Sequence, residues 1–328
     1  MTSLLAAAGR GVLSGLALLG RYGTQAFAIS LFVGLALPWL AAAARPLLAV
    51  AIFVFLLTTF VRVEVSAVRS VARRPGLFGL ACLCTVLVPP LVVSGAVALV
   101  GRQEIDPGLL LGLAVLAAAP PIMSSPAIAM LLGIEPALII ATVLVVTGLS
   151  PILSPLIAGL VAGAAVPMDV PSLVARLVGL VGGALLTALV LRRFVSREAI
   201  GRNRQSLDGI GVFMYFVFAI AAMDGVLPAV LGEPLRVAGY LAAAFAISLA
   251  GYAVSWPLLR AVPPAERLVL GYATGQRNMG LLIAALGAST PKTTFLFFAL
   301  AQFPIYIGPQ IIRVVTRNST VFHEGQSR

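Results

Sequence analysis

The residues Gly275-Gln276-Arg277-Asn278 interrupt an otherwise apolar segment that runs from Leu268 to Gly287. An ionised arginine at membrane depth costs roughly 2.5–3.5 kcal/mol on insertion scales. Glycines flank the arginine, at 275 and 280, and weaken a helix at the same place. A broken helix that carries amides and a cation is a common way for transporters to build a binding site at the bilayer midplane. This stretch therefore predicts a functional break within a membrane helix.

The composition around this stretch is that of a membrane protein. The chain of 328 residues is 60% hydrophobic and only 10% charged, and long apolar stretches recur from residue 22 to residue 316. About 20 apolar residues cross a hydrocarbon core, where the backbone must satisfy its own hydrogen bonds. The sequence therefore predicts an all-α membrane protein. Ten transmembrane helices are expected at 22–42, 46–61, 76–100, 108–131, 136–164, 171–191, 209–230, 235–259, 266–287 and 294–314.

The basic residues predict how the chain is oriented. The net charge of +11 does not indicate nucleic-acid binding, because the basic residues lie between spans and not on one soluble face. With both termini in the cytoplasm, the far side of the membrane holds only Arg45, Arg102, Arg176, Arg236 and Lys292. This asymmetry supports an even number of spans, since cytoplasmic loops are rich in Lys and Arg. We interpret the chain as an integral protein of a bacterial inner membrane. Its expected partner is the lipid bilayer, and no nucleic-acid partner is expected.

The chain divides into two predicted repeats. Residues 1–21 are expected to form an interfacial segment, 22–191 the first five-helix repeat, 192–208 a cytoplasmic connector, 209–316 the remainder of a second repeat that begins with the 171–191 helix, and 317–328 a cytoplasmic tail. Because five is an odd number, two repeats of five spans have opposite orientations. Inverted repeats of this kind are typical of secondary transporters.

The fourth predicted span is also interrupted, by the sequence Pro120-Pro121-Ile122-Met123-Ser124-Ser125-Pro126. Its prolines remove backbone donors and kink a helix. The fourth and ninth spans correspond in the two repeats, and interruptions at equivalent positions point to a binding site. The hydroxyls of Ser124 and Ser125, with Thr142 on the next span, can bind either a cation or the backbone of their own helix. Both interpretations stay open.

Arg277 also has two interpretations. It carries five donors and a permanent charge, between the amides of Gln276 and Asn278. In the structural interpretation the guanidinium clamps the carbonyls of the neighbouring break. In the functional interpretation it meets an anionic substrate or replaces a metal cation. The acidic residues considered as its partners are few: Glu135, Asp224 and Glu266. Asp224 is interpreted as interfacial, and Glu266 is about 16 Å away along a helix and cannot pair directly.

The order and spacing of these features resemble the bile acid:sodium symporter family from about residue 40 onward. The resemblance rests on Arg74-Pro75, the Pro-rich fourth break, Ser150-Pro151 with Pro155, and Asn278-Met279-Gly280-Leu281. It implies a core domain of spans three to five and eight to ten, and a panel domain of spans one, two, six and seven. It also implies that helices four and nine cross at their breaks and that transport occurs by alternating access.

The resemblance further implies two sodium sites near the crossing. By position, Ser124, Ser125 and Thr142 resemble ligands of the first ion, and Gln276 and Thr85 resemble contributors to the second. In the ninth span, the family's glutamate falls on Ala273, and the glutamine before its asparagine falls on Arg277. In the fourth span its asparagine falls on Ser125, and in the fifth span a serine falls on Leu138. The site loses a carboxylate and gains a guanidinium, beside which sodium ions are unfavourable. We therefore expect the fold without ordinary sodium coupling, and no cofactor.

The expected function is secondary active transport of a small organic anion, a carboxylate or sulfonate. The residues expected to bind the substrate are Arg277, Asn278, Gln276, Ser124 and Ser125. One alternative is a carrier for a cationic or neutral solute, in which Arg277 is structural; arsenite-efflux carriers share the same broad fold. Another is a membrane sensor that transports nothing. The sequence does not indicate whether the protein is a monomer or a dimer.

Other reactive residues give no competing prediction. No enzyme is expected, because the sequence has neither an H-E-x-x-H nor a G-x-S-x-G motif and its only histidine, His323, lies in the tail. No cysteine lies in either break, which disfavours a soft metalloid as the substrate. Cys82 and Cys84 are interpreted as small buried residues of the third span.

Overall fold

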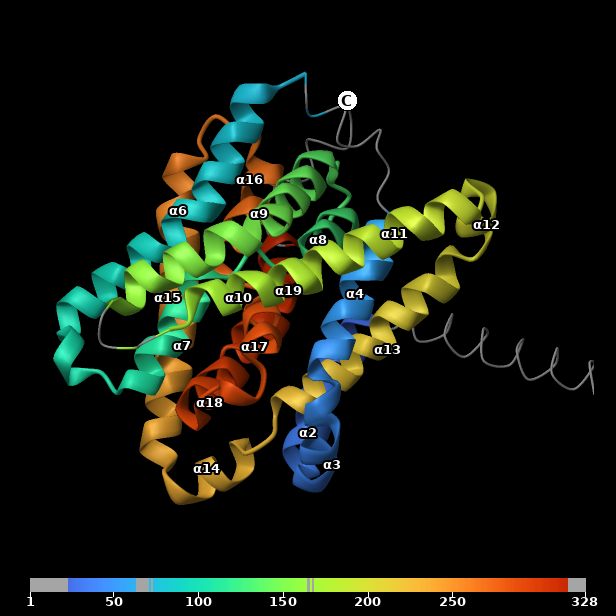
Figure 1. The fold of residues 1–328 in the computed structure, drawn as a ribbon. Helices are drawn as coiled ribbons and strands as arrows, with labels where there is room; N and C mark the ends of the chain where they lie inside the picture. Colours follow the sequence, from blue (N-terminus) through green and yellow to red (C-terminus); the bar gives the residue numbers. More distant parts are fainter. Residues whose placement is uncertain (1–22, 63–70, 72, 164–165, 167, 318–328) are drawn as a thin grey trace, which may run out of the picture. The chain divides into compact units, whose positions relative to one another are not determined.

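The computed structural model describes residues 23–62, 71, 73–163, 166 and 168–317, which fold almost entirely as helices (Figure 1). The predicted segment 1–21 and nearly all of the tail 317–328 lie outside these residues, and the connector 192–208 contains the short helix α12. The helices are α2 (Gly23–Ala36), α3 (Pro38–Ala44), η1 (Arg45–Leu47), α4 (Leu48–Arg62), α6 (Pro75–Val100), η2 (Arg102–Glu104), α7 (Pro107–Ala118), α8 (Ser125–Leu131), α9 (Ala137–Ala162), α10 (Val170–Leu177), η4 (Val178–Gly182), α11 (Gly183–Phe194), α12 (Arg197–Arg202), α13 (Arg204–Ala222), α14 (Val226–Gly232), α15 (Pro234–Leu258), α16 (Pro264–Gly275), α17 (Met279–Leu286), η5 (Gly287–Ser289), α18 (Lys292–Leu300) and α19 (Gln302–Arg317).

The prediction of an all-α fold is confirmed for the described residues, and their long apolar helices are suited to membrane spans. In the described part of the chain, six helices are long and apolar enough to cross a membrane. They coincide with the second, third, fifth, sixth, seventh and eighth predicted spans. Their bounds are Pro38–Val61, Pro75–Val100, Ala137–Ala162, Val170–Phe194, Gly209–Gly232 and Pro234–Leu258.

The other four predicted spans are each divided into shorter helices. The stretch 22–42 is divided at Leu37, because the residue before a proline is driven out of the α region and Pro38 begins the next helix. The stretches 108–131 and 266–287 each contain two helices separated by residues that are not helical. The stretch 294–314 is divided at Ala301, where α18 meets α19. Length alone therefore does not identify these segments as spans.

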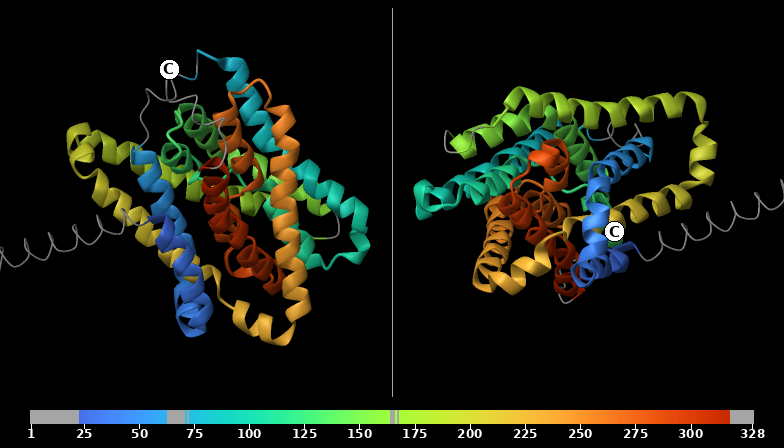
Figure 2. Two further views of the ribbon diagram at one scale, coloured as in Figure 1. Left: turned by 180° about the vertical axis from the view of Figure 1, so that it is seen from behind. Right: turned by 60° about the horizontal axis from the view of Figure 1, so that its bottom comes forward.

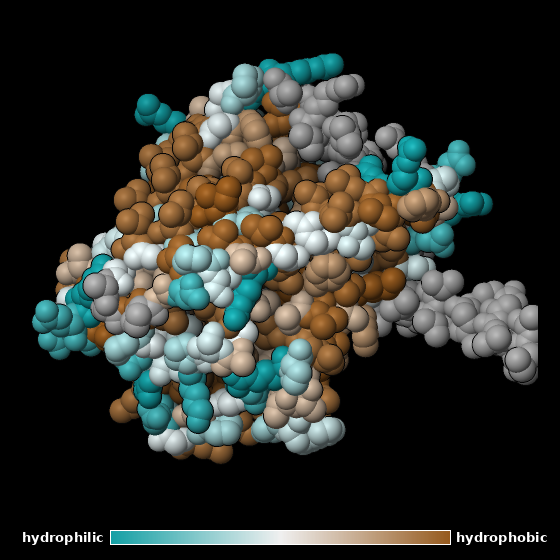
Figure 3. Space-filling view, in the orientation of Figure 1, coloured by the Kyte–Doolittle hydropathy of each residue, from teal (hydrophilic) through white to brown (hydrophobic). Residues whose placement is uncertain are grey.

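Helix α9 shows the pattern that a lipid environment requires. Leu149, Ile152, Leu156 and Leu160 are 47%, 60%, 55% and 79% exposed and recur at helical spacing. Large apolar side chains in a row on an outer face mark contact with lipid or a partner. Hydrophobic residues likewise cover much of the face drawn in Figure 3. The outward face of α9 is therefore suited to the hydrocarbon core of a bilayer.

The helices group into two compact units, and each is assembled from two separate parts of the chain. The first unit comprises residues 1–63 and 176–232. Within it, α13 packs against α2, α3 and α4, and α11 packs against α4. The short helix α12 joins α11 to α13 as a hairpin (Figure 2). The first unit therefore brings two distant parts of the chain into direct helix contact.

An ion pair links η1 of the first unit to the residues after α13. Arg45 Nη1 lies 2.6 Å from Asp224 Oδ2, and the two side chains are 41% and 18% exposed. An ion pair with this much solvent access contributes about 1 kcal/mol or less. The structure thus gives Asp224, the acidic residue that the sequence placed nearest the membrane, a partner at the edge of a helix.

The substitution Asp224→Asn is expected to lower stability by no more than about 1 kcal/mol, because the ion pair with Arg45 is partly open to solvent. Thermal unfolding of the purified variant in detergent measures the effect. A much larger loss of stability would contradict the weak contribution expected of this pair.

The second unit comprises residues 64–175 and 233–328 and contains both interrupted helices. Helices α6 and α9 pack against α7 and α16, while α15 packs against α16 and α18 against both α7 and α17. The two interruptions are consequently enclosed by helices of the same unit. Their residues are buried almost throughout, from Leu110 to Met123 and from Leu268 to Ile283.

Candidate functional site

The two interruptions meet through their backbones. The Ile122 amide donates to the Gln276 carbonyl at 3.0 Å, and the Asn278 amide donates to the Pro120 carbonyl at 2.8 Å. These reciprocal bonds form an isolated antiparallel bridge between Pro121 and Arg277. Two non-helical segments, about 150 residues apart in the sequence, therefore satisfy each other's backbone at the point where both helices stop.

Proline chemistry explains why the fourth-span break pairs in this way. Pro120 and Pro121 have no amide hydrogen, so Ile122 carries the first donor after them. The carbonyls at the end of α7 find partners from elsewhere. Ser154 Oγ on α9 donates to the Ala118 carbonyl at 2.7 Å, and Arg277 Nη2 donates to the Ala119 carbonyl. The break is thus held by side chains that the fifth and ninth predicted spans supply.

A close approach of two backbones fixes the end of α16. A Cβ atom on Gly275 would overlap the carbonyl oxygen of Ser248 on α15, and a Cβ on Gly251 would lie 3.0 Å from Gly275 Cα. Only glycine therefore fits at position 275. The sequence marked this glycine as a helix breaker, and the structure adds that it lets α15 and α16 touch.

Gly275→Ala is expected to destabilise the folded protein by about 1–3 kcal/mol, because the backbone of α15 must move to make room. The matched control is Gly148→Ala on α9, where a Cβ meets nothing within 4 Å and alanine favours the helix. Thermal unfolding of the purified variants in detergent measures both. Equal melting temperatures for the two variants would contradict the proposed close contact.

Arg277 is the unusual residue of this crossing. Its side chain is only 4% exposed, and it forms no ion pair with any residue in the described part of the chain. Nη2 contacts the Ala119 carbonyl, but Nε and Nη1 have no hydrogen-bond partner among the described residues. A buried charge is costly unless it is paired. The structural clamp is therefore present, yet it uses only one of the three nitrogens.

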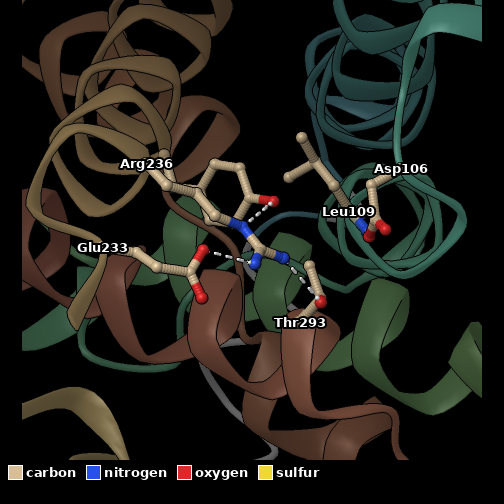
Figure 4. Close-up of polar contacts among 6 residues, drawn as sticks. Asp106, Leu109, Glu233, Arg236 and Thr293 are labelled. Atoms are coloured by element: carbon tan, nitrogen blue, oxygen red, sulfur yellow. Dashed lines mark hydrogen bonds and ion pairs between the residues drawn. The ribbon is translucent and has the colours of Figure 1, made fainter. Parts of the chain in front are cut away.

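In another arginine of the same unit, both the donors and the charge have protein partners. Arg236, at the start of α15, donates from Nη1 to Glu233, from Nε to the Tyr240 hydroxyl and from Nη2 to Thr293, at 2.7–2.9 Å (Figure 4). All three nitrogens have partners, and a carboxylate balances the charge. Arg277 differs from Arg236 because, among the described residues, it has neither a carboxylate partner nor a full set of paired donors.

The amides beside Arg277 have different surroundings. Gln276 Nε2 donates to Ser248 Oγ, which in turn donates to the Gly275 carbonyl at 3.2 Å. This network fixes Gln276 to α15. Asn278 is 7% exposed and precedes α17, but its side chain does not cap that helix. Of the two amides, Gln276 is therefore the one that a side-chain hydrogen bond holds in place.

The predicted hydroxyl ligands mostly bond to their own helices. Ser125 Oγ donates to the Ile122 carbonyl, Thr142 Oγ1 to Leu138, and Thr85 Oγ1 to Ala81 and Cys82, at 2.8–3.0 Å. Local bonding of this kind is the structural interpretation of these residues. Each oxygen still has a free lone pair. Ser124 is half-buried and does not cap α8.

Sequence reasoning missed several residues that surround Arg277. Ser154 and Ser248 lie on α9 and α15, outside both breaks, and only the fold brings them to the crossing. Cys84 of α6 is buried and interacts electrostatically with Arg277. A cysteine is therefore next to the ninth-span break, although none lies within it.

Among the described residues, no three His, Cys, Asp or Glu side chains come together as they would to hold a metal ion. The donors at the crossing are a guanidinium, amides and hydroxyls. This set suits an anion with oxygen atoms better than a metal ion.

No protein-family model matches the chain, and no curated protein matches it either.

Proposed function

We propose that this protein is a secondary active transporter for a small organic anion, similar to bile acid:sodium symporters, and that Arg277 replaces a cation ligand. The observation that carries this proposal is the buried guanidinium at the crossing, with two nitrogens lacking a protein partner. Carboxylate and sulfonate oxygens accept two parallel hydrogen bonds from a guanidinium. An anion of this kind balances the charge as well as the donors.

The organisation of the chain supports a transporter of this type. The first unit contains the first, second and seventh predicted spans with most of the sixth, and the second unit contains the third to fifth and eighth to tenth. The same division between panel and core is implied by the resemblance. The meeting of two interrupted helices in the second unit supports crossed helices four and nine, two inverted five-helix repeats, and alternating access.

The same residues argue against ordinary sodium coupling. Ala273 and Leu138 are buried and offer no oxygen from their side chains where relatives of this type place sodium ligands. Arg277 brings a positive charge to the same place, which opposes a sodium ion by Coulomb repulsion. We therefore propose that substrate transport does not depend on two sodium ions. Substitution of potassium or choline for sodium in a transport assay is expected to leave the rate unchanged.

A thermal-shift experiment tests the proposal. The purified full chain in detergent is mixed with pyruvate, succinate or isethionate, and in parallel with choline and ethylene glycol, which share the hydroxyethyl group of isethionate but not its charge. A ligand at 100 times its dissociation constant stabilises a folded protein by about 2.7 kcal/mol. Stabilisation by at least one anion, and by neither control, is expected. Stabilisation by choline alone, or by nothing in the panel, would overturn the proposal.

One observation favours a second candidate, a carrier of a cationic or neutral solute. Arg277 Nη2 contacts the Ala119 carbonyl, which gives the arginine a structural role of its own. If this contact were the whole role of the arginine, choline or ethylene glycol would stabilise the protein and the anions would not. The same panel therefore distinguishes the two functions.

A further inference from the structure

We propose that this protein works as an obligatory anion exchanger, in which one anion must leave the site for another to be carried in the opposite direction. The inference rests on the proposed function and specifies how transport is driven. It follows from the way in which the charge of Arg277 is balanced.

Carboxylates of the protein do not balance this charge. In the part of the chain that the structure describes, Arg277 forms no ion pair. Glu266 begins α16 eleven residues earlier, which places it about 16 Å away along a helix. Glu135 lies in the turn after α8 and makes no ion pair with Arg277 either.

Helix dipoles also leave the charge largely unbalanced. The carboxyl ends of α7 and α16 reach the crossing, and each carries a partial negative charge. The amino ends of α8 and α17 begin at the same crossing and carry partial positive charges of similar size. The four ends oppose one another in pairs. The guanidinium therefore remains the only full charge that the described residues bring to this place.

Cys84 is the remaining group that has to be considered. It interacts electrostatically with Arg277, and its thiolate form would neutralise the guanidinium. A cysteine side chain is an uncharged thiol unless it loses its proton, so Cys84 as a thiol supplies no negative charge. The protein thus relies on a bound anion to balance Arg277.

This dependence makes the two halves of a transport cycle unequal. In alternating access the site must pass through a state that is closed to water on both sides. With an anion bound, Arg277 crosses that state as a neutral ion pair. Without an anion, the guanidinium has to pass through that closed state with no counter-charge and no water able to reach it, which is strongly unfavourable. The loaded protein can therefore change conformation rapidly, whereas the unloaded protein cannot, so an anion must travel in each direction.

The test uses the full chain reconstituted in phosphatidylethanolamine and phosphatidylglycerol vesicles. Uptake of radiolabelled isethionate is measured into vesicles filled with unlabelled isethionate, or with sucrose of equal osmolarity, in low-chloride buffer. Uptake into the isethionate-filled vesicles is expected to be at least about tenfold faster. A tenfold ratio of rates corresponds to a difference of about 1.36 kcal/mol in activation free energy. An imposed potassium diffusion potential should have little effect, because exchange of like anions moves no net charge. The same comparison is made with pyruvate and succinate.

Lys292→Gln is the matched control variant. Lys292 is an exposed residue at the start of α18, so this variant removes one positive charge outside the crossing and should keep the same dependence on internal anion. Equal uptake into sucrose-filled and isethionate-filled vesicles would overturn the exchange mechanism while leaving anion transport intact. Absence of anion-dependent stabilisation in detergent would instead overturn the proposed function, so the two failures are distinguishable.

Discussion

Arg277→Gln is expected to weaken binding of the stabilising anion by at least roughly 30-fold, because removal of one partner of a buried charge pair costs about 2–5 kcal/mol. Glutamine keeps a donor near the position of the guanidinium but removes the charge. The affinity is measured by thermal shift across a concentration series of pyruvate, succinate or isethionate. Arg277→Lys should retain part of the affinity, since it keeps the charge and loses the two-pronged geometry.

The same substitution has a second consequence for the protein without an anion. The wild type carries a desolvated charge that is 4% exposed, with Nε and Nη1 unpaired. Loss of this charge removes a cost of several kcal/mol, whereas loss of the bond to the Ala119 carbonyl costs about 1.5–3 kcal/mol. The anion-free Gln variant should consequently melt at the same temperature as the wild type or higher.

This second measurement separates the two roles of Arg277. A purely structural arginine predicts the opposite pair of results, a lower melting temperature and an unchanged anion affinity. Lys292→Gln serves as the charge control, because it removes one positive charge from an exposed position. A weaker affinity in Lys292→Gln, equal to that in Arg277→Gln, would show that net charge and not the crossing attracts the anion.

The sequence predicted the two interruptions because their cause is local. Pro120 and Pro121 lack amide hydrogens, and Gly275 lowers helix stability, so both breaks follow from the residues themselves. Ser124 and Ser125, which the sequence indicated as binding residues, are not the residues that the backbone bridge pairs with Arg277. The backbone bonds place Pro121 opposite Arg277, since Ile122 is the first residue after the prolines that can donate.

The surroundings of the breaks were beyond the reach of the sequence. Helix α6 is apolar on almost all sides, so its pattern does not indicate which face turns inward. The approach of Cys84 to Arg277 is therefore a result of packing alone. Ser248 is hidden for a similar reason, because the contact of α15 with Gly275 depends on a missing side chain and not on a motif.

A carboxylate placed beside Arg277 should act as a competitor for the anion. Cys84→Asp puts one at the position whose side chain already interacts electrostatically with the guanidinium. An ion pair inside the protein would then balance the charge, and an external anion would have to displace it. The affinity for the stabilising anion is expected to fall at least about tenfold, or 1.4 kcal/mol, at pH 7. Thermal-shift titration measures this change.

Cys84→Asn is the matched control for that variant, because asparagine has the size of aspartate and no charge. The loss of anion affinity in Cys84→Asn measures the steric effect of the larger side chain. Any further loss in Cys84→Asp is the effect of its charge. The double variant Cys84→Asp with Arg277→Gln completes a double-mutant cycle. In it the buried carboxylate has lost its partner, so the protein should be less stable than the two single variants predict.

If Cys84→Asp and Cys84→Asn weaken binding of the anion equally, the carboxylate does not reach the guanidinium. If they differ as expected, the balance of charge at Arg277 decides which anions are bound, since any internal carboxylate that neutralises the arginine removes the reason for an anion to enter.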